Sequence, residues 1–305
     1  MRGIVLAGGH GTRLAPSTQA TSKHLFPVYD KPLVYYPIAT LMLTGIREIL
    51  VIATPRDLPR YRSALGDGTR LGIALSYAAQ ERPNGLAEAL TIGAGFVGDD
   101  DVALILGDNV FHGPELADLL RAQAGHLDGC VLFGSPVADP RRYGVAEVDA
   151  SGRLVSIEEK PERPRSRTAV TGLYLYDNDV LDIAARVRPS DRGELEITDV
   201  NRAYVARGRA RLVDLGSDVA WLDAGTEDSL LEAATLVRDV HRREGVRVAC
   251  LEETALRMGF IDAEACLDLG AGLGACPYGE YVRRVGLRAL SQRRRPAGTT
   301  WSRAG

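Results

Sequence analysis

Four apolar runs in the first half of the chain are continuous, without alternating polar residues. They span 3–7, 49–53, 102–106 and 130–133. Continuous runs of this length are typical of parallel strands that are buried on both faces. The segments between them are long enough for crossover helices, and 37–45 and 86–96 show the best helical patterns. The alternation predicts a layered α/β fold with a mostly parallel central sheet.

The pattern changes after about residue 140. Two strand-like runs, 145–148 and 154–158, flank the turn sequence Asp149–Gly152 and predict a hairpin. Thr226 is a helix N-cap candidate, with acidic residues in the first turn of a helix that should run to about Arg243. The further elements that we expect are strands at 170–176 and 219–222 and helices at 179–187, 197–206, 253–258 and 262–269.

Charge and composition exclude some partners. The 305 residues include 37 basic and 40 acidic residues, and the net charge of −3 gives no overall attraction to nucleic acid or membrane. No stretch approaches the ~20 apolar residues that span a bilayer. After Glu280 the chain has seven arginines and no acidic residue. Such a tail can bind nucleic acid or acidic membranes, but we expect 282–305 to be a solvated, disordered terminus.

The cysteines indicate the compartment. Four cysteines are widely spaced, with no Cys/His metal pattern. The apolar run at the start is too short for a signal-peptide core. We therefore expect reduced, structural cysteines and a cytoplasmic protein.

A glycine-rich loop follows the first predicted strand, at Gly8-Gly9-His10-Gly11-Thr12. Glycines let backbone N–H groups approach a phosphate closely. The loop is neither GxGxxG nor a Walker sequence, so by itself it can also be an ordinary tight turn. Arg13 and Lys23 add two cations that suit the charge of a triphosphate, whereas we expect Lys31 at the surface.

The order and spacing of several motifs carry a resemblance. They are GGHGTRL, SKHLFPVYDKPLVYYPI, LGDNVFHG, DPRRYGVAEVD, EEKPERPRS, RGELEITDVN and AWLDAGT. From Arg2 to about Tyr281 the chain resembles the sugar-1-phosphate nucleotidylyltransferases, and most closely their glucose-1-phosphate thymidylyltransferases. The resemblance implies a three-layer, Rossmann-like nucleotide-diphospho-sugar transferase fold with a sugar-binding elaboration and C-terminal helices.

The resemblance also implies an activity and an organisation. The activity is thymidylyl transfer from dTTP to glucose 1-phosphate, which gives dTDP-glucose and pyrophosphate for deoxysugar synthesis. The catalytic domain would span 1–240, with a nucleotide part at about 1–110 and a sugar-phosphate part at about 111–225. A C-terminal helical segment, 241–281, would lie at a subunit interface of a homo-oligomer, a tetramer.

The site residues that the resemblance implies fall into four sets. The catalytic set is Arg13, Lys23, Asp108 and Arg192. The nucleotide set is Leu6, Gly8, Gly9, Gly11, Thr12, Arg13, Gln80, Pro83, Gly85, Leu86 and Asp108. The sugar-phosphate set is Asn109, Tyr143, Gly144, Glu159, Lys160 and Val170. Asp108 and Asp223 would hold Mg²⁺, which takes only one or two protein carboxylates.

Each assignment has a structural alternative. An Asp that follows a strand, as Asp108 and Asp223 do, can instead cap a helix or a turn. Arg192 can form a salt bridge with Glu194 or Glu196. Adjacent strand residues point to opposite faces, so Glu159 and Lys160 serve one site only if the chain bends there, as the following proline allows.

Three other functions stay open. The same chemistry could use UTP, since one methyl group is worth only about 1–3 kcal/mol. A non-catalytic nucleotide-sugar sensor would lack the charged residues that are present here. A glycosyltransferase could use the D-x-D sequence Asp99–Asp101, but this lies before a predicted strand, at the wrong end of a parallel sheet for a ligand site. His112, Pro114 and Ser217 depart from the family pattern and predict altered inhibition by the final nucleotide-sugar.

Overall fold

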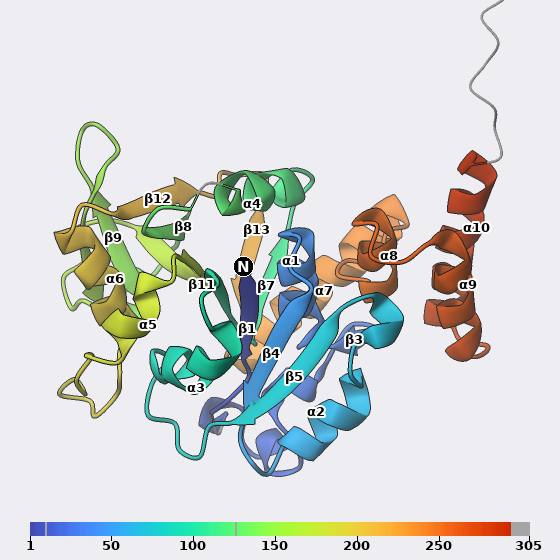
Figure 1. The fold of residues 1–305 in the computed structure, drawn as a ribbon, viewed down its shortest axis with the longest axis horizontal. Helices are drawn as coiled ribbons and strands as arrows, with labels where there is room; N and C mark the ends of the chain where they lie inside the picture. The colour runs from blue at the N-terminus through green and yellow to red at the C-terminus, as the bar shows by residue number, and fades with distance from the viewer. Residues whose placement is uncertain (10, 126, 294–305) are drawn as a thin grey trace, which may run out of the picture.

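The computed structural model describes residues 1–9, 11–125 and 127–293, and within them a nine-stranded sheet forms the centre of the molecule (Figure 1). Seven strands follow one another in the order β10-β9-β11-β6-β1-β4-β5, and β8 and β12 extend the sheet from β11. The strands are β1 (Arg2–Leu6), β4 (Glu48–Ala53), β5 (Ala74–Ala79), β6 (Val102–Leu106), β8 (Cys130–Pro136), β9 (Gly144–Val148), β10 (Leu154–Glu159), β11 (Thr168–Tyr176) and β12 (Ala210–Asp214).

The sheet has a parallel half and an antiparallel half. Strands β6, β1, β4 and β5 run parallel. The continuous apolar sequences of β6, β1 and β4 predict this, whereas β5 has no such run. Strand β11 runs antiparallel to β6, β8 and β9, and β9–β10 is the predicted hairpin. The fold class expected from the sequence is confirmed.

Helices cover both faces of the sheet. One core contains α1 (Tyr35–Leu43), α2 (Leu58–Leu65), α4 (Leu116–Ala124) and α8 (Leu251–Arg257). The core on the other face contains α3 (Glu88–Val97), α5 (Asp179–Ala184) and α6 (Ile197–Ala206). Side chains of neighbouring positions along one strand, such as Ile4 and Val5, enter opposite cores, because successive residues of a strand face opposite ways. This is the predicted three-layer arrangement. None of the described helices is both long and apolar enough to cross a lipid bilayer.

A small second sheet joins distant parts of the chain. Strand β7 (Asn109–His112) pairs antiparallel with β13 (Ala220–Asp223), so that Asn109 lies opposite Asp223 and His112 opposite Ala220. Helix α7 (Glu227–Glu244) follows, and Thr226 caps it as predicted by accepting a hydrogen bond from the Ser229 backbone N–H. The effect of His112 on inhibition stays a prediction.

The C-terminal region corrects one expectation. Helices α9 (Ala263–Gly272) and α10 (Pro277–Arg293) pack side by side at the edge of the molecule (Figure 1). Residues 282–293, predicted to be disordered, are therefore helical. The many arginines obscured the apolar positions Tyr278, Val282 and Val285, which have helical spacing and pack in a core with α8 and α9. The rest of the predicted tail, 294–305, lies outside the described residues.

A hairpin between β1 and α1 corrects a second expectation. Its strands are β2 (Pro27–Val28) and β3 (Lys31–Pro32). Lys31 is only 4% exposed, although we expected it at the surface. Its ammonium group donates to Asp30, 2.5 Å away, and to the carbonyl oxygen of Val248, 2.8 Å away. The neighbouring Asp30 and the distant Val248 together satisfy the buried ammonium group, and no local pattern reveals the contact with Val248.

A buried polar chain holds the segment that carries Lys23. The hydroxyl of Ser22 lies 3.0 Å from His24 Nδ1 and 2.9 Å from the hydroxyl of Tyr61, which also donates to the carbonyl oxygen of Ala7. Burial first, and the Lys23 ammonium second, lower the pKa of His24 from 6.5 to about 3. His24 is therefore a neutral hydrogen-bonding residue of the fold.

Replacing His24 with Gln is expected to flatten the loss of stability in acid. In the unfolded chain His24 takes up a proton near pH 6.5, whereas in the folded protein it stays neutral to about pH 3. Because the folded pKa is the lower one, its contribution to stability is lost as pH falls from 6.5 toward 3. Between pH 7 and pH 5 the free energy of unfolding should fall by roughly 2 kcal/mol through this group. Denaturant unfolding at the two pH values measures this; an equal pH dependence in His24→Gln and wild type would contradict it.

Candidate active site

A cleft of about 490 Å³ opens at the carboxyl ends of the parallel strands β1 and β6, where Leu6 and Leu106 are among its lining residues. This volume is within the ordinary range for small-molecule sites. Ligands bind at this end of an open α/β sheet. The D-x-D sequence lies at the other end, before β6, where Asp100 pairs with the Met1 amino group and Arg2. The interpretation of that sequence as a turn is confirmed.

The cleft gathers nearly all of the predicted site residues from distant segments of the chain. Those that line it are Leu6, Gly8, Gly9, Gly11, Thr12, Arg13, Lys23, Gln80, Pro83, Gly85, Leu86, Asp108, Asn109, Tyr143, Gly144, Glu159, Lys160, Val170 and Asp223. Arg192 is the exception among the predicted residues. Its guanidinium pairs with Glu194 at 2.8 Å and Glu196 at 3.0 Å, which is the alternative that the sequence left open.

Asp108 forms an ion pair with Lys23 inside the cleft. Lys23 Nζ lies 2.5 Å from Asp108 Oδ2, and both side chains are 12% exposed. Burial raises the pKa of Asp108, but Lys23 and the amide of Asn109 outweigh it and hold that pKa below the ordinary value. Asp108 is therefore an anion at neutral pH.

Asn109 fixes the orientation of Asp108. Its Nδ2 donates to Asp108 Oδ1 at 3.0 Å, while its Oδ1 accepts from the Gly172 backbone N–H and from Trp221 Nε1. A side chain on Gly172 would collide with Asn109, because a Cβ there would lie 2.7 Å from Asn109 Oδ1. The predicted sugar-phosphate residue Asn109 thus links the end of β6 to the middle of β11 and to β13.

Asp223 brings a second, half-buried carboxylate to the same cleft. Burial first, and the negative charge of Asp108 second, raise the pKa of Asp223. Arg13 opposes this rise and lies against the loop after Asp223, where a Cβ on Gly225 would be 2.9 Å from Arg13 Nη2. The carboxylates of Asp108 and Asp223 repel one another, and the cations Lys23 and Arg13 lie close enough to offset part of that repulsion.

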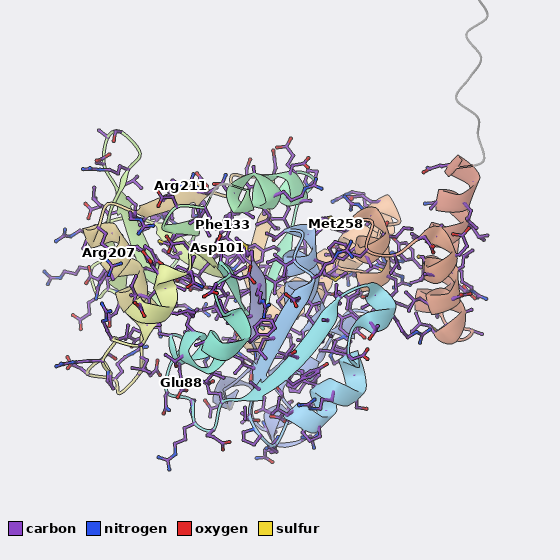
Figure 2. All side chains as sticks on the ribbon, in the orientation of Figure 1. Glu88, Asp101, Phe133, Arg207, Arg211 and Met258 are labelled. Carbon is purple, nitrogen blue, oxygen red and sulfur yellow. The ribbon has the colours of Figure 1, made fainter. Side chains whose placement is uncertain are left out.

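Gln80 lies beside Gly8 of the glycine loop, and hydrogen bonds hold its side-chain amide in place. Its Nε2 donates to Glu88 Oε2 at 2.8 Å and to the carbonyl oxygen of Gly85. Glu88 stands at the start of α3 (Figure 2). A Cβ on Gly8 would lie 2.5 Å from Gln80 Oε1, so the loop approaches the amide as only glycine allows. One held amide with a free acceptor face can read the edge of a pyrimidine.

The far end of the cleft holds an acid and a cation side by side. Glu159 Oε2 accepts a hydrogen bond from Thr198 Oγ1 at 2.5 Å, and Glu159 Oε1 lies 3.6 Å from Lys160 Nζ. Lys160 has a left-handed backbone, with φ of 43°. This is the bend that both side chains need to line one cleft, because in a regular strand they would point to opposite faces.

Aromatic side chains close the wall between the two ends. The rings of Tyr143 and Trp221 meet edge to face with centroids 5.3 Å apart, and the Arg142 guanidinium lies over the Tyr143 ring. An apolar wall with nearby cations suits a sugar that carries a phosphate.

Several lining residues were missed from the sequence. They are His24, Leu106, Arg142, Gly172, Tyr174, Glu194, Ile197, Thr198, Asn201, Trp221 and Gly225. The only signal for most of them was their place inside the quoted motifs, such as Trp221 in AWLDAGT and Thr198 in RGELEITDVN.

The donor set fits one kind of metal ion. Within 1–9, 11–125 and 127–293, no group of three or more His, Cys, Asp and Glu side chains could hold a metal. Two carboxylates, Asp108 and Asp223, nevertheless line one cleft, and their mutual repulsion favours a dication between them. Hard oxygen ligands in this number suit Mg²⁺, which takes its other ligands from phosphates and water.

Comparisons with known proteins agree with this geometry. Residues 2–240 match the family model described as "Nucleotidyl transferase". A glucose-1-phosphate thymidylyltransferase from Mycolicibacterium smegmatis is 53% identical over 93% of this chain and 99% of its own. One from Xanthomonas campestris is 51% identical over 94% of this chain and 97% of its own.

Solved structures agree in fold. A chain from Bacillus anthracis, provisionally assigned as a glucose-1-phosphate thymidylyltransferase and crystallised with sucrose, has a TM-score of 0.73 at 39% identity, covering 78% of this chain and 96% of that one. A UDP-glucose pyrophosphorylase with bound UDP-glucose has a TM-score of 0.68 at 23% identity, covering 78% and 98%, and shares the fold. The chain described here therefore belongs to the nucleotidyl transferase family and, within it, to the glucose-1-phosphate thymidylyltransferases.

Proposed function

We propose that this protein transfers a thymidylyl group from dTTP to α-D-glucose 1-phosphate, giving dTDP-glucose and pyrophosphate for deoxysugar synthesis. One observation carries the proposal. A single cleft joins two cations beside a glycine loop, Arg13 and Lys23, to a carboxylate–ammonium pair at its far end, Glu159 and Lys160. That layout fits a triphosphate at one end and a sugar phosphate at the other.

The reaction needs positioning and charge more than a base. A phosphate oxygen of the sugar phosphate attacks the α-phosphorus in line, a new P–O bond forms, and the bond to pyrophosphate breaks. The attacking oxygen is already ionised, so no proton has to be removed. The residues must hold the two substrates in line and stabilise the departing charge.

We assign the nucleotide end to the glycine loop and to Gln80. The backbone N–H groups of Gly8, Gly9, Gly11 and Thr12 can face phosphate oxygens, and Arg13 and Lys23 supply positive charge for the departing pyrophosphate. The Gln80 amide, held by Glu88, would read the thymine ring. Leu6, Pro83, Gly85 and Leu86 would complete the pocket around the nucleoside.

We assign the sugar end to the residues around the β9–β10 hairpin. Glu159 would accept hydrogen bonds from sugar hydroxyls, with Thr198 holding its other oxygen. Lys160 would pair with the phosphate as a compact cation. Gly144 leaves room beside Glu159, and Asn109, Tyr143 and Val170 complete this end of the cleft.

Asp108 and Asp223 would hold Mg²⁺. The bound ion would neutralise phosphate charge near the reacting phosphorus. Asn109 keeps the Asp108 carboxylate in place, and Lys23 keeps it ionised.

We further propose a cytoplasmic homo-oligomer, a tetramer. Three of the four cysteines, all without a disulfide partner in the described part of the chain, are buried. Leu231 on α7 and Leu287 on α10 are large apolar side chains with exposures of 67% and 59%, which suits a subunit interface.

Pyrophosphate release tests the proposed function directly. With glucose 1-phosphate and Mg²⁺, we expect turnover with dTTP, and comparison with UTP, CTP, ATP and GTP gives the preference. Lys23→Met should lower kcat by about 10²–10³-fold, the usual effect of losing one charge-stabilising donor. Asp108→Asn should lose at least as much, and a rate for either variant near that of wild type would contradict the roles assigned here.

A second comparison distinguishes the role of Arg192 from that of Arg13. Arg192 does not line the cleft, and its guanidinium is paired with Glu194, which does, and with Glu196. Arg192→Gln should therefore lower kcat much less than Arg13→Gln. Steady-state kinetics of the two variants under the same conditions measure this. An equal or larger loss in Arg192→Gln would mean that its guanidinium leaves the two glutamates and enters the site during turnover.

A further inference from the structure

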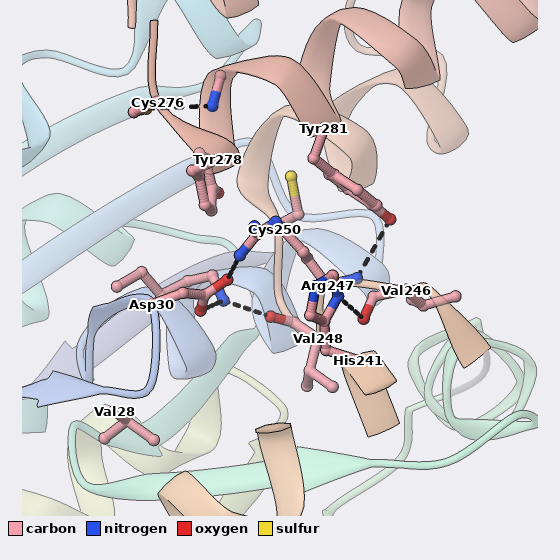
Figure 3. Close-up of polar contacts among 12 residues, drawn as sticks. Val28, Asp30, His241, Val246, Arg247, Val248, Cys250, Cys276, Tyr278 and Tyr281 are labelled. Carbon is pink, nitrogen blue, oxygen red and sulfur yellow. Dashed lines mark hydrogen bonds and ion pairs between the residues drawn. The ribbon is translucent and has the colours of Figure 1, made fainter. Parts of the chain in front are cut away.

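A buried ion cluster joins the β2–β3 hairpin to the segment after α7. Asp30 lies at its centre (Figure 3): one carboxylate oxygen accepts from Lys31 Nζ at 2.5 Å, and the other is paired with Arg247 Nη1. The side chains of the three residues are 11%, 2% and 7% exposed, in the order Asp30, Lys31 and Arg247. Two cations thus share one carboxylate away from water.

Aromatic rings hold the cluster against three helices. The Arg247 guanidinium lies over the rings of Tyr278 and Tyr281 on α10, and Lys31 Nζ lies 5.0 Å from the centre of the Tyr36 ring on α1. The Tyr281 hydroxyl accepts from the Arg247 backbone N–H at 3.2 Å and donates to Glu253 on α8 at 2.5 Å. Residues more than two hundred positions apart therefore depend on one carboxylate.

Two features of the cluster lower the stability of the folded protein. Tyr29, beside Asp30, has a left-handed backbone with φ of 63°, which is uncommon for a residue other than glycine. Arg247 Nε is buried and has no hydrogen-bond partner among the residues that the structure describes. Strained and unsatisfied groups persist where the surroundings hold them in place, and they concentrate at functional positions.

The hairpin is the direct continuation of the segment that carries Lys23. Lys23 begins the 3₁₀ helix Lys23–Leu25, and the hairpin closes on that turn through hydrogen bonds from Leu33 N–H to Phe26 and from Val34 N–H to His24. Their N···O distances, 2.9 and 2.8 Å, are those of well-formed backbone hydrogen bonds. A displacement of the hairpin tip at Asp30 is therefore passed to the backbone that presents Lys23 to Asp108.

We propose that Asp30 and Arg247 are positioning residues for the reaction. Their ion pair anchors the β2–β3 hairpin on the C-terminal helical segment and thereby holds Lys23 in place for the triphosphate. The inference rests on the proposed function for the role of Lys23, and it extends that function to residues outside the cleft lining. The C-terminal segment, which lies far from Lys23 in the sequence, thereby contributes to the nucleotide end of the site.

The test compares three substitutions with a matched control in the full-length protein. Arg247→Met keeps the length and loses the charge, Arg247→Lys restores a charge, and Asp30→Asn removes the shared carboxylate. Arg209→Met is the control, because Arg209 is paired with Asp177 at 2.6 Å beside β12, outside the segment that carries Lys23. Thermal unfolding is recorded for every variant, and kinetics are measured below all unfolding transitions.

We expect kcat/KM for dTTP to fall roughly 10- to 100-fold in Arg247→Met and in Asp30→Asn, since a small misplacement of a positioning group has effects of this size. The KM for glucose 1-phosphate should stay near that of wild type, because the charged residues assigned to the sugar phosphate, Glu159 and Lys160, lie at the end of β10. Arg247→Lys should recover most of the loss. Arg209→Met should lower the unfolding temperature with little change in kcat/KM.

Equal kinetic losses in Arg247→Met and Arg209→Met, or a loss of stability in Arg247→Met without a change in kcat/KM for dTTP, would overturn the proposal. If Arg247→Met does not fold, Tyr281→Phe removes only the hydroxyl that accepts from the Arg247 backbone, and it should show a smaller change in the same direction. Equilibrium binding of dTTP without sugar phosphate adds a readout independent of turnover. An inactive wild type would refute the proposed function, whereas unchanged dTTP affinity in Arg247→Met would refute the anchor.

Discussion

The repulsion between two carboxylates, the buried Asp108 and the half-buried Asp223, is the constraint on which the rest of this structure depends. Each follows or ends a strand, and the short β7–β13 sheet places Asn109, next to Asp108, opposite Asp223. Two such groups can share a cleft only if positive charge surrounds them. Lys23 supplies this positive charge by direct contact with Asp108, and Arg13 supplies it from beside the glycine loop. The glycine loop, the lysine turn (the 3₁₀ helix Lys23–Leu25) and both strand ends therefore form one electrostatic unit.

The larger architecture follows from that unit. The lysine turn must stay close to β6, and a buried chain of hydroxyls and a neutral imidazole fixes its start. Its end leads into a hairpin held by a second buried group of charges around Asp30. Lys23, which stands on a short 3₁₀ turn and pairs with Asp108 in the cleft, is therefore restrained from both sides.

The parallel strands, the hairpin at 149–152 and the Thr226 cap were predictable from sequence because their signals are local. Strand β5 and helices α2 and α4 were not, because their apolar positions are few and mixed with polar residues. The predictions for Lys31 and for residues 282–293 were wrong for a related reason. Partners such as Val248 and α9 lie far away in sequence, and a count of charges suggested exposure.

The site was predictable in a different way. The glycine loop and its two cations could be argued from the residues, whereas the roles of Gln80, Glu159 and Asp223 rested on the resemblance. Trp221 and Thr198 carry no local chemical signal, and only the pairing of strands brings them to the cleft. A motif match does not fix where a side chain points. Arg192 matches the motif, yet its guanidinium is paired with Glu194 and Glu196 and does not line the cleft.

Strand β11 has a consequence for how such a protein can change over evolutionary time. It runs between β6 on the nucleotide side and β8 and β9 on the sugar side, and its pairing with β8 shifts register between Val170 and Tyr174. The residues proposed for the nucleotide and those proposed for the sugar phosphate thus lie on segments that have largely separate neighbours, so a substitution in one set need not disturb the other. That independence ends at Gly172, where any side chain would displace Asn109 and with it the geometry of Asp108. Variation in the hairpin half is therefore compatible with an unchanged Asp108 geometry only while position 172 remains glycine.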